Sequence, residues 1–206
     1  MRFLLLSLKV RTYNACMLEL KFKNTQICLD FSFFAVLTLF LMFYNTNFGV
    51  VALAACGIHE FSHLLAMTIC RVKVQKITFY GAGVRISSPQ TDNSPTWVRL
   101  TVLSAGCTAN FIAAVVYWVH GNEAAAMINL LTGVFNLLPI GEHDGAELIK
   151  MLLIKICRPE NVDKIMRYIS ISTELFLTGL ILFSGNRVPF VVITTLLYIL
   201  IMCVKR

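Results

Sequence analysis

Long apolar stretches separated by short polar segments dominate the hydrophobic pattern of this chain. Six of them approach the roughly 20 residues that an α-helix needs to cross a bilayer. They cover residues 29–44, 48–70, 97–119, 124–140, 168–183 and 188–204. The pattern therefore predicts an all-α polytopic membrane protein with about six transmembrane helices.

The connection between the second and third stretches has a different periodicity. From Arg71 onward, apolar and polar residues alternate over several positions, and Gly81 and Gly83 follow. Alternation with period two around a glycine turn predicts a small β-hairpin at the membrane surface. Such a hairpin either closes the loop or binds an extended peptide along a free edge, and the sequence leaves both roles open.

Composition supports a membrane location. Apolar residues make up 57% of the chain and charged residues 14%, against roughly 45–50% and about 25% in soluble domains. This composition excludes a soluble monomer. The net charge of +7 comes from only 18 basic residues against 11 acidic ones, without the dense basic cluster that tracks a phosphate backbone, so no nucleic-acid partner is expected.

The positions of the basic residues predict the orientation in the membrane. With six spans, all of the 18 Lys and Arg residues except Arg187 fall on one side. Because cytoplasmic loops carry the excess of Lys and Arg, we expect a multi-pass protein of the cell membrane with both termini in the cytoplasm and anionic lipid contacting that face. No connection is long enough for an independent domain, so residues 1–206 are predicted to form a single membrane-embedded domain.

The seven cysteines form no CxxC or CxxH pair, and several lie in apolar stretches. We interpret those in apolar stretches as small hydrophobic residues, and the seven cysteines give no reliable information about the redox compartment. The short apolar segment at residues 3–8 is followed by Lys9 and lacks a cleavage site, so it is not expected to be a secretory signal.

The second apolar stretch contains the sequence HEFSH, which includes His59, Glu60 and His63. Histidines four residues apart stand on one face of a helix, so both imidazoles can reach one ion while Glu60 lies beside an open coordination position. A charge near the bilayer centre costs roughly 2.5–3.5 kcal/mol on insertion scales. A bound cation would offset that cost, so the motif predicts a metal site.

Zinc in a catalytic site needs a third protein ligand. The best candidates follow the fourth apolar stretch, in the segment NLLPIGEHDGAEL at residues 136–148. Its Pro and Gly residues interrupt the helix and place Glu142, His143 and Asp144 at the cytoplasmic end, in the same leaflet as HEFSH. The residues alone leave all three open as ligands.

HEFSH followed by NLLPIGEHDG resembles the site-2 protease family of intramembrane zinc metalloproteases, and the compact six-span form is similar to the stage IV sporulation protease group. The resemblance covers residues 48–148. It implies that His59, His63 and Asp144 hold one Zn²⁺ and that Glu60 is the catalytic base. The positions that match the family's second motif are Asn136, Pro139, Asp144 and Gly145.

A third segment, SAGCTAN, is similar to the family's AGPxxN. Ala105, Gly106 and Asn110 match it, and Cys107 stands where the family usually has proline. Asn110 and Asn136 either orient a substrate backbone or satisfy contacts between helices, as buried Asn often does in membranes. Neither a PDZ nor a CBS domain is expected.

The resemblance implies a zinc metalloendopeptidase that hydrolyses a peptide bond in or near the membrane-spanning part of another protein. Zinc would lower the pKa of its water toward about 7, and Glu60 would take the proton. The expected partners are a single-span membrane protein substrate and membrane-bound regulators. The alternative is a non-proteolytic membrane protein, such as a metal transporter or an inactive homologue, although transporters generally carry more intramembrane carboxylates.

Overall fold

The computed structural model describes residues 7–9, 16–22, 25–43, 46–81, 83–88, 94–141 and 143–183. The chain forms two compact units, Met1–Gly106 and Cys107–Arg206. The boundary between them falls inside helix α4, Thr96–Val119. The predicted span at residues 188–204 and the candidate ligand Glu142 lie outside the described residues.

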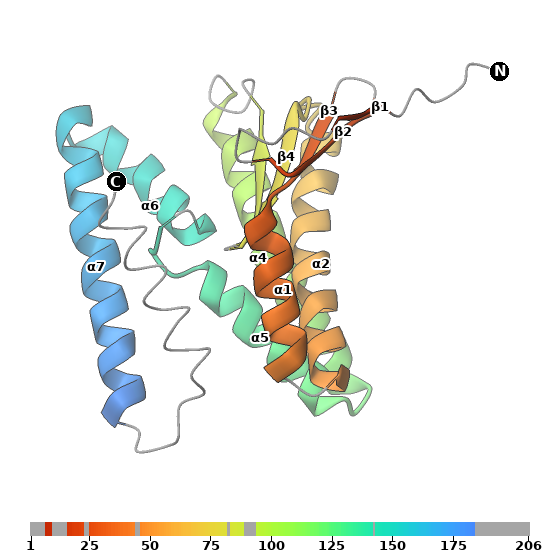
Figure 1. The fold of residues 1–206 in the computed structure, drawn as a ribbon. Helices are drawn as coiled ribbons and strands as arrows, with labels where there is room; N and C mark the ends of the chain where they lie inside the picture. The colour runs from red at the N-terminus through yellow and green to blue at the C-terminus, as the bar shows by residue number, and fades with distance from the viewer. Residues whose placement is uncertain are drawn as a thin grey trace. The chain divides into compact units, whose positions relative to one another are not determined.

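The N-terminal unit contains a five-stranded sheet (Figure 1). Its strands follow the chain in the order β1-β2-β3-β4-β5, so β5 lies at one end of the described sheet. Strands β3 and β4 pair in parallel and the other neighbours are antiparallel. The strands are β1 (Ser7–Lys9), β2 (Leu18–Phe22), β3 (Thr25–Leu29), β4 (Lys76–Tyr80) and β5 (Gly83–Ser87).

The predicted hairpin is confirmed as β4 and β5, in which Ile77 pairs with Ile86. The expectation of a hairpin alone was wrong, because the segment before the first helix adds three more strands. The signal for β2 was present in the sequence: Leu18 and Leu20 alternate with Glu19 and Lys21. This period-two alternation is typical of a half-buried strand.

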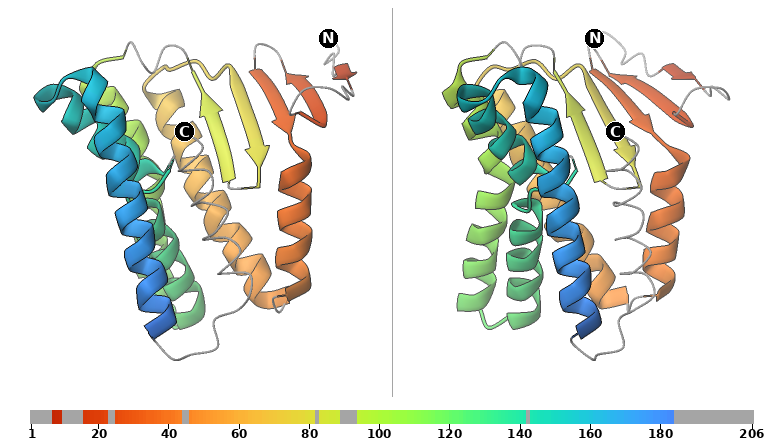
Figure 2. Two further views of the ribbon diagram at one scale, coloured as in Figure 1. Left: turned by 60° about the vertical axis from the view of Figure 1, so that its left-hand side comes forward. Right: turned by 90° about the vertical axis from the view of Figure 1, so that its left-hand side faces the viewer.

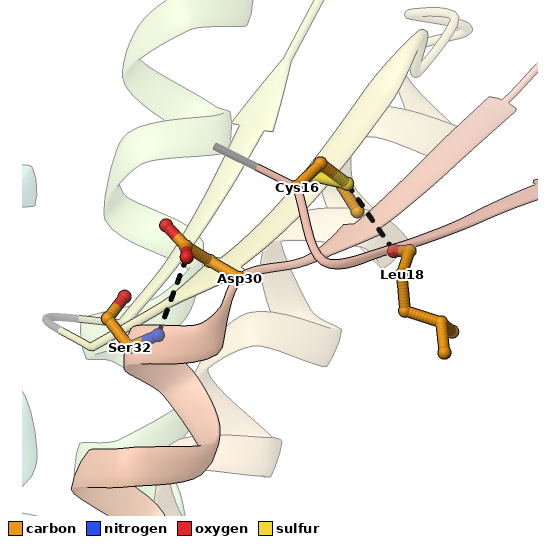
Figure 3. Close-up of a disulfide and its surroundings, with 5 residues drawn as sticks. Cys16, Leu18, Asp30 and Ser32 are labelled. Carbon is orange, nitrogen blue, oxygen red and sulfur yellow. Dashed lines mark hydrogen bonds between the residues drawn. A yellow bond between two sulfur atoms is a disulfide. The ribbon is translucent and has the colours of Figure 1, made fainter. Parts of the chain in front are cut away.

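A disulfide joins Cys16 to Cys28 across the β2–β3 pair (Figure 3). Their Cα atoms are 5.6 Å apart, and the neighbouring backbone is paired because the Met17 amide donates to the Leu29 carbonyl at 2.9 Å. The sequence pattern of the cysteines gave no indication of this pairing. A separation of 12 residues gives no hint of pairing until the strand register is known.

Strand β3 leads directly into α1 (Phe31–Phe43), which is followed by α2 (Thr46–Ile69). Asp30 lies at the junction, where its Oδ1 accepts a hydrogen bond from the Ser32 amide at 3.4 Å (Figure 3). This is the pattern of a helix N-cap. The two helices form the long crossover that a parallel β3–β4 pair requires, and the sheet lies where α1 begins and α2 ends (Figure 2).

The hydrophobic core of the N-terminal unit lies where α2, the hairpin and the beginning of α4 meet. Ala66 and Met67 of α2 pack with Val98 and Val102 of α4, and Val72 completes the cluster. All five are buried. This packing fixes the C-terminal half of α2, which carries HEFSH, against the first turns of α4.

The C-terminal unit consists of the rest of α4 with α5 (Glu123–Asn136), α6 (Asp144–Ile156) and α7 (Pro159–Phe183). Asn122 caps α5, since its Oδ1 accepts a hydrogen bond from the Ala125 amide at 3.1 Å. Ala146 of α6 packs with Val162 and Met166 of α7, and these two helices lie side by side (Figure 1).

Two helices in the described part of the chain are long and apolar enough to cross a membrane, Asn47–Ile69 and Thr96–Val119, and Phe31–Met42 is a shorter apolar helix. Large apolar side chains on α2 and α4 are exposed, as Ile69 (72%) and Trp118 (65%) show, which suits a lipid environment. The mostly helical fold with a small sheet is confirmed, whereas the number of six spans stays a prediction. Helix α6 occupies part of a segment that was expected to be a cytoplasmic connection.

Candidate metal centre

The HEFSH motif lies on α2 within the N-terminal unit, as predicted. The side chains of His59 and His63 are buried, with 4% and 8% of their surface exposed. Their Nε2 atoms are 3.1 Å apart. One helical turn therefore brings both ring nitrogens to a single point, while Glu60 lies between them in sequence and is only half-buried.

Helix α4 orients the second histidine. The Nδ1 atom of His63 lies 2.7 Å from the backbone carbonyl oxygen of Val102. A carbonyl oxygen only accepts hydrogen bonds, so Nδ1 carries the proton and Nε2 keeps its lone pair. Metal-binding histidines are commonly held in this way, with the remote nitrogen bonded to a backbone carbonyl or carboxylate.

Gly106 of α4 leaves the space that the two imidazoles occupy. A Cβ atom at this position would lie 2.5 Å from His63 Nε2 and 2.6 Å from His59 Cε1. Gly106 itself is buried. The glycine of the SAGCTAN segment is thus required by the close approach of α4 to both histidines.

The two imidazoles suit zinc. In a tetrahedral zinc site, two nitrogen ligands at about 2.0–2.1 Å from Zn²⁺ lie about 3.3–3.4 Å from each other. The two Nε2 atoms are 3.1 Å apart, which is close to this spacing. Two imidazoles with adjacent Nε2 atoms, one of them held by a backbone carbonyl, form a donor set typical of zinc sites.

Asp144 lies in the C-terminal unit as the first residue of α6. Its Oδ2 atom is 3.6 Å from the thiol sulfur of Cys107, which donates the hydrogen bond. Gly145 follows at a point where a Cβ atom would overlap the backbone carbonyl of Leu137. The glycine after Asp144 is therefore required by the tight return of the chain from α5 into α6.

The segment between α5 and α6 is held by α7. The Ser170 hydroxyl donates to the Pro139 carbonyl at 2.9 Å, and the following residue, Ile140, is buried with 1% exposure. His143 turns its Nδ1 toward the Ile140 carbonyl and packs edge-on against the ring of Phe135. The Nδ1 atom of His143 is thus engaged with the backbone and is not available to a metal.

The two asparagines named in the sequence analysis make contacts within the C-terminal unit. Asn110 has no exposed surface, and its amide donates to Asn129 Oδ1 at 3.1 Å. The Asn129 amide donates in turn to the Ala125 carbonyl at 2.9 Å. Asn136 donates to the Thr132 carbonyl one turn earlier in α5, at 3.0 Å. These contacts agree with a helix-packing role, and a role toward substrate stays a prediction for both.

Sequence reasoning did not identify Asn129 and Ser170, which hold Asn110 and the Pro139 segment. A weak signal existed, because both are polar residues inside apolar stretches, where such residues often face another helix. The contact between Cys107 and Asp144 was also not foreseen. No sequence pattern links these two residues to each other.

Comparison with known proteins agrees with these geometric findings. The family described as Peptidase family M50 matches residues 47–124, which include HEFSH and SAGCTAN. The solved structure described as a site-2 protease from Methanocaldococcus jannaschii superimposes with a TM-score of 0.67 at 21% sequence identity. The alignment covers 90% of this chain and 92% of that one. No curated protein sequence matches the chain. Residues 47–124 thus match the model of Peptidase family M50, and the fold of the chain is similar to that of the site-2 protease from Methanocaldococcus jannaschii.

Proposed function

We propose that this protein is an intramembrane zinc metalloendopeptidase that cleaves a transmembrane or membrane-proximal segment of another membrane protein. The observation that carries the proposal is the pair of buried imidazoles on α2, with Nε2 atoms 3.1 Å apart and His63 oriented by the Val102 carbonyl. The peptidase family that matches this segment supports the same chemistry.

We assign the three protein ligands of the zinc ion to His59, His63 and Asp144. Gly106, which both imidazoles approach, and Cys107, which contacts the Asp144 carboxylate, are consecutive residues of α4. A carboxylate is a common third ligand beside two histidines in catalytic zinc sites. The contact with Cys107 supports Asp144 as the third ligand, and Glu142 lies outside the described residues.

A zinc ion held by His59, His63 and Asp144 would supply Lewis-acid chemistry toward the peptide carbonyl and would lower the pKa of water. Glu60 accepts the proton of the attacking water and later donates it to the leaving amine. Val102 keeps His63 in the tautomer that presents Nε2. Burial of both histidines limits the access of bulk water and strengthens electrostatic interactions around the scissile bond.

The substrate class follows from the backbone chemistry of membrane helices. The carbonyls of a helix already accept hydrogen bonds within the helix, so a peptide must unwind before one of them is attacked. We propose a single-span membrane protein whose unwound segment is cleaved, in a regulated process of which sporulation is one setting. Strand β5, at the end of the described sheet, offers an edge where an extended segment can pair.

Removing the metal tests this function directly. We expect the detergent-purified protein to contain one zinc ion per chain and to cleave a co-expressed single-span substrate. Chelation should abolish cleavage, and zinc should restore it because two of the three proposed ligands, His59 and His63, already lie together in the buried site. Stoichiometric zinc without cleavage of any tested substrate would favour the transporter or inactive-homologue alternative, and absence of both would refute the proposal.

We also propose that both termini and the sheet face the cytoplasm, where the bias of Lys and Arg would place them. The disulfide between Cys16 and Cys28 argues for the opposite orientation, because disulfides are rare in the reducing cytoplasm. Lys73 follows α2, His120 follows α4, and both residues are exposed. Chemical labelling at these two positions distinguishes the two orientations.

In intact cells, a membrane-impermeant maleimide should label His120→Cys and leave Lys73→Cys unlabelled, each in a background without other accessible cysteines. After the cells are opened, both variants should react, which controls for the reactivity of each site. Labelling of Lys73→Cys alone in intact cells would reverse the orientation and would agree with an oxidised Cys16–Cys28 pair.

A further inference from the structure

We propose that Cys107 is a positioning residue for the zinc ligand Asp144. Its thiol donates a hydrogen bond to one carboxylate oxygen and so presents the other oxygen to the metal. The inference rests on the proposed function, because it assigns a role toward the zinc ion. It concerns a position at which this chain differs from the family pattern that its sequence resembles.

The contact lies within the C-terminal unit. The sulfur of Cys107 is 3.6 Å from Asp144 Oδ2, and Cys107 is buried with 2% exposure. A thiol is a weak donor to neutral acceptors, but a carboxylate is a charged acceptor and strengthens the bond. A carboxylate that donates one oxygen to a metal still has a second oxygen to satisfy.

The two residues have little freedom to separate. Cys107 lies inside α4, and Asp144 begins α6 directly before Gly145, whose Cα hydrogen faces the Leu137 carbonyl. The Ser170 hydroxyl fixes the preceding Pro139 carbonyl. The backbone on both sides of the contact is therefore restrained, so the thiol acts on the side-chain torsion of Asp144.

Proline at position 107 would have no side-chain donor and could not make this hydrogen bond. In this chain the orientation of the carboxylate thus depends on the thiol. Hydrogen-bond partners of metal ligands contribute about 10–100-fold to metal affinity in other zinc proteins. We expect an effect of this size here.

The test compares Cys107→Ala, which removes the donor, with Cys107→Ser, which restores one. Zinc affinity is measured in the full-length protein in detergent, by competition with a chromogenic chelator. Cys107→Ala should weaken zinc binding about 10–100-fold, and Cys107→Ser should recover most of that loss. The matched control is Cys157→Ala, at another free and partly buried cysteine, which should bind zinc like the wild type.

Measurements on the metal-free protein distinguish a packing role of Cys107 from a positioning role. Circular dichroism and thermal unfolding of the metal-free Cys107→Ala protein should match the wild type, because the expected loss appears only when metal binds. Equal zinc affinity of Cys107→Ala and wild type would overturn the inference, and so would a serine variant no better than alanine.

Cobalt distinguishes a positioning thiol from a ligand. Co²⁺-substituted wild-type protein should lack the near-ultraviolet thiolate-to-cobalt charge-transfer band, since we assign the thiol to Asp144 in its protonated form. A strong band lost in Cys107→Ser would make Cys107 a ligand and overturn the inference. If the wild-type protein binds no metal at all, the proposed function itself fails. If it binds metal and substitutions at position 107 do not change the affinity, only the positioning role of Cys107 fails.

Discussion

Replacing Glu60 with glutamine should lower the rate of substrate cleavage by at least about 100-fold and up to about 10,000-fold, the usual contribution of a general acid–base residue. Glutamine keeps the size and much of the polarity of the side chain but cannot accept a proton from water. Zinc content should remain one per chain, since the proposed ligands are untouched. Cleavage is measured by co-expression with a single-span substrate, and metal by elemental analysis of the purified protein.

The matched control for this substitution is Glu123→Gln, an exposed glutamate in the first turn of α5. It removes the same charge and should leave cleavage within about twofold of the wild type, because a surface side chain outside the site contributes little. Cleavage by Glu60→Gln at the wild-type rate would remove Glu60 from the mechanism. Loss of zinc together with activity would instead assign Glu60 a role in holding the metal.

The local geometry of the candidate site could be predicted from the sequence. Two histidines four residues apart on a helix necessarily share a face, and the structure places His59 and His63 with their Nε2 atoms adjacent. The interruption after Asn136 was also predictable, because Pro139 cannot continue a helix and α5 ends at Asn136. These features depend on local geometry, which a sequence specifies directly.

Features that depend on pairing between distant segments could not be predicted in the same way. The carbonyl of Val102 orients His63 through a contact over 39 residues, and every residue type has such a carbonyl. Strands β2 and β3 are five residues each, and the alternation within β2 does not show which segments it pairs with. A short strand is stabilised by its neighbours in the sheet more than by its own composition.

Gly106→Ala should abolish zinc binding and cleavage although no ligand is changed. The added methyl group would lie 2.5 Å from His63 Nε2 and 2.6–2.7 Å from two ring atoms of His59, far inside van der Waals contact. Both imidazoles are buried, so one or both must rotate, and the bond from His63 Nδ1 to the Val102 carbonyl is strained or broken. We expect at least a 100-fold loss of zinc affinity, measured by chelator competition, since both displaced rings are proposed ligands.

The control is Gly57→Ala, two residues before HEFSH on α2, where a Cβ atom would meet nothing within 4 Å. Alanine is favoured over glycine inside a helix by about 1 kcal/mol, so this variant should be at least as stable as the wild type and keep its zinc. The same chemical change thus has opposite expected outcomes at two helical positions, and the difference comes from the distance to the imidazoles alone. Zinc affinity of Gly106→Ala equal to that of Gly57→Ala would show that α4 does not approach the histidines as described, and the geometric basis for the zinc site would fall with it.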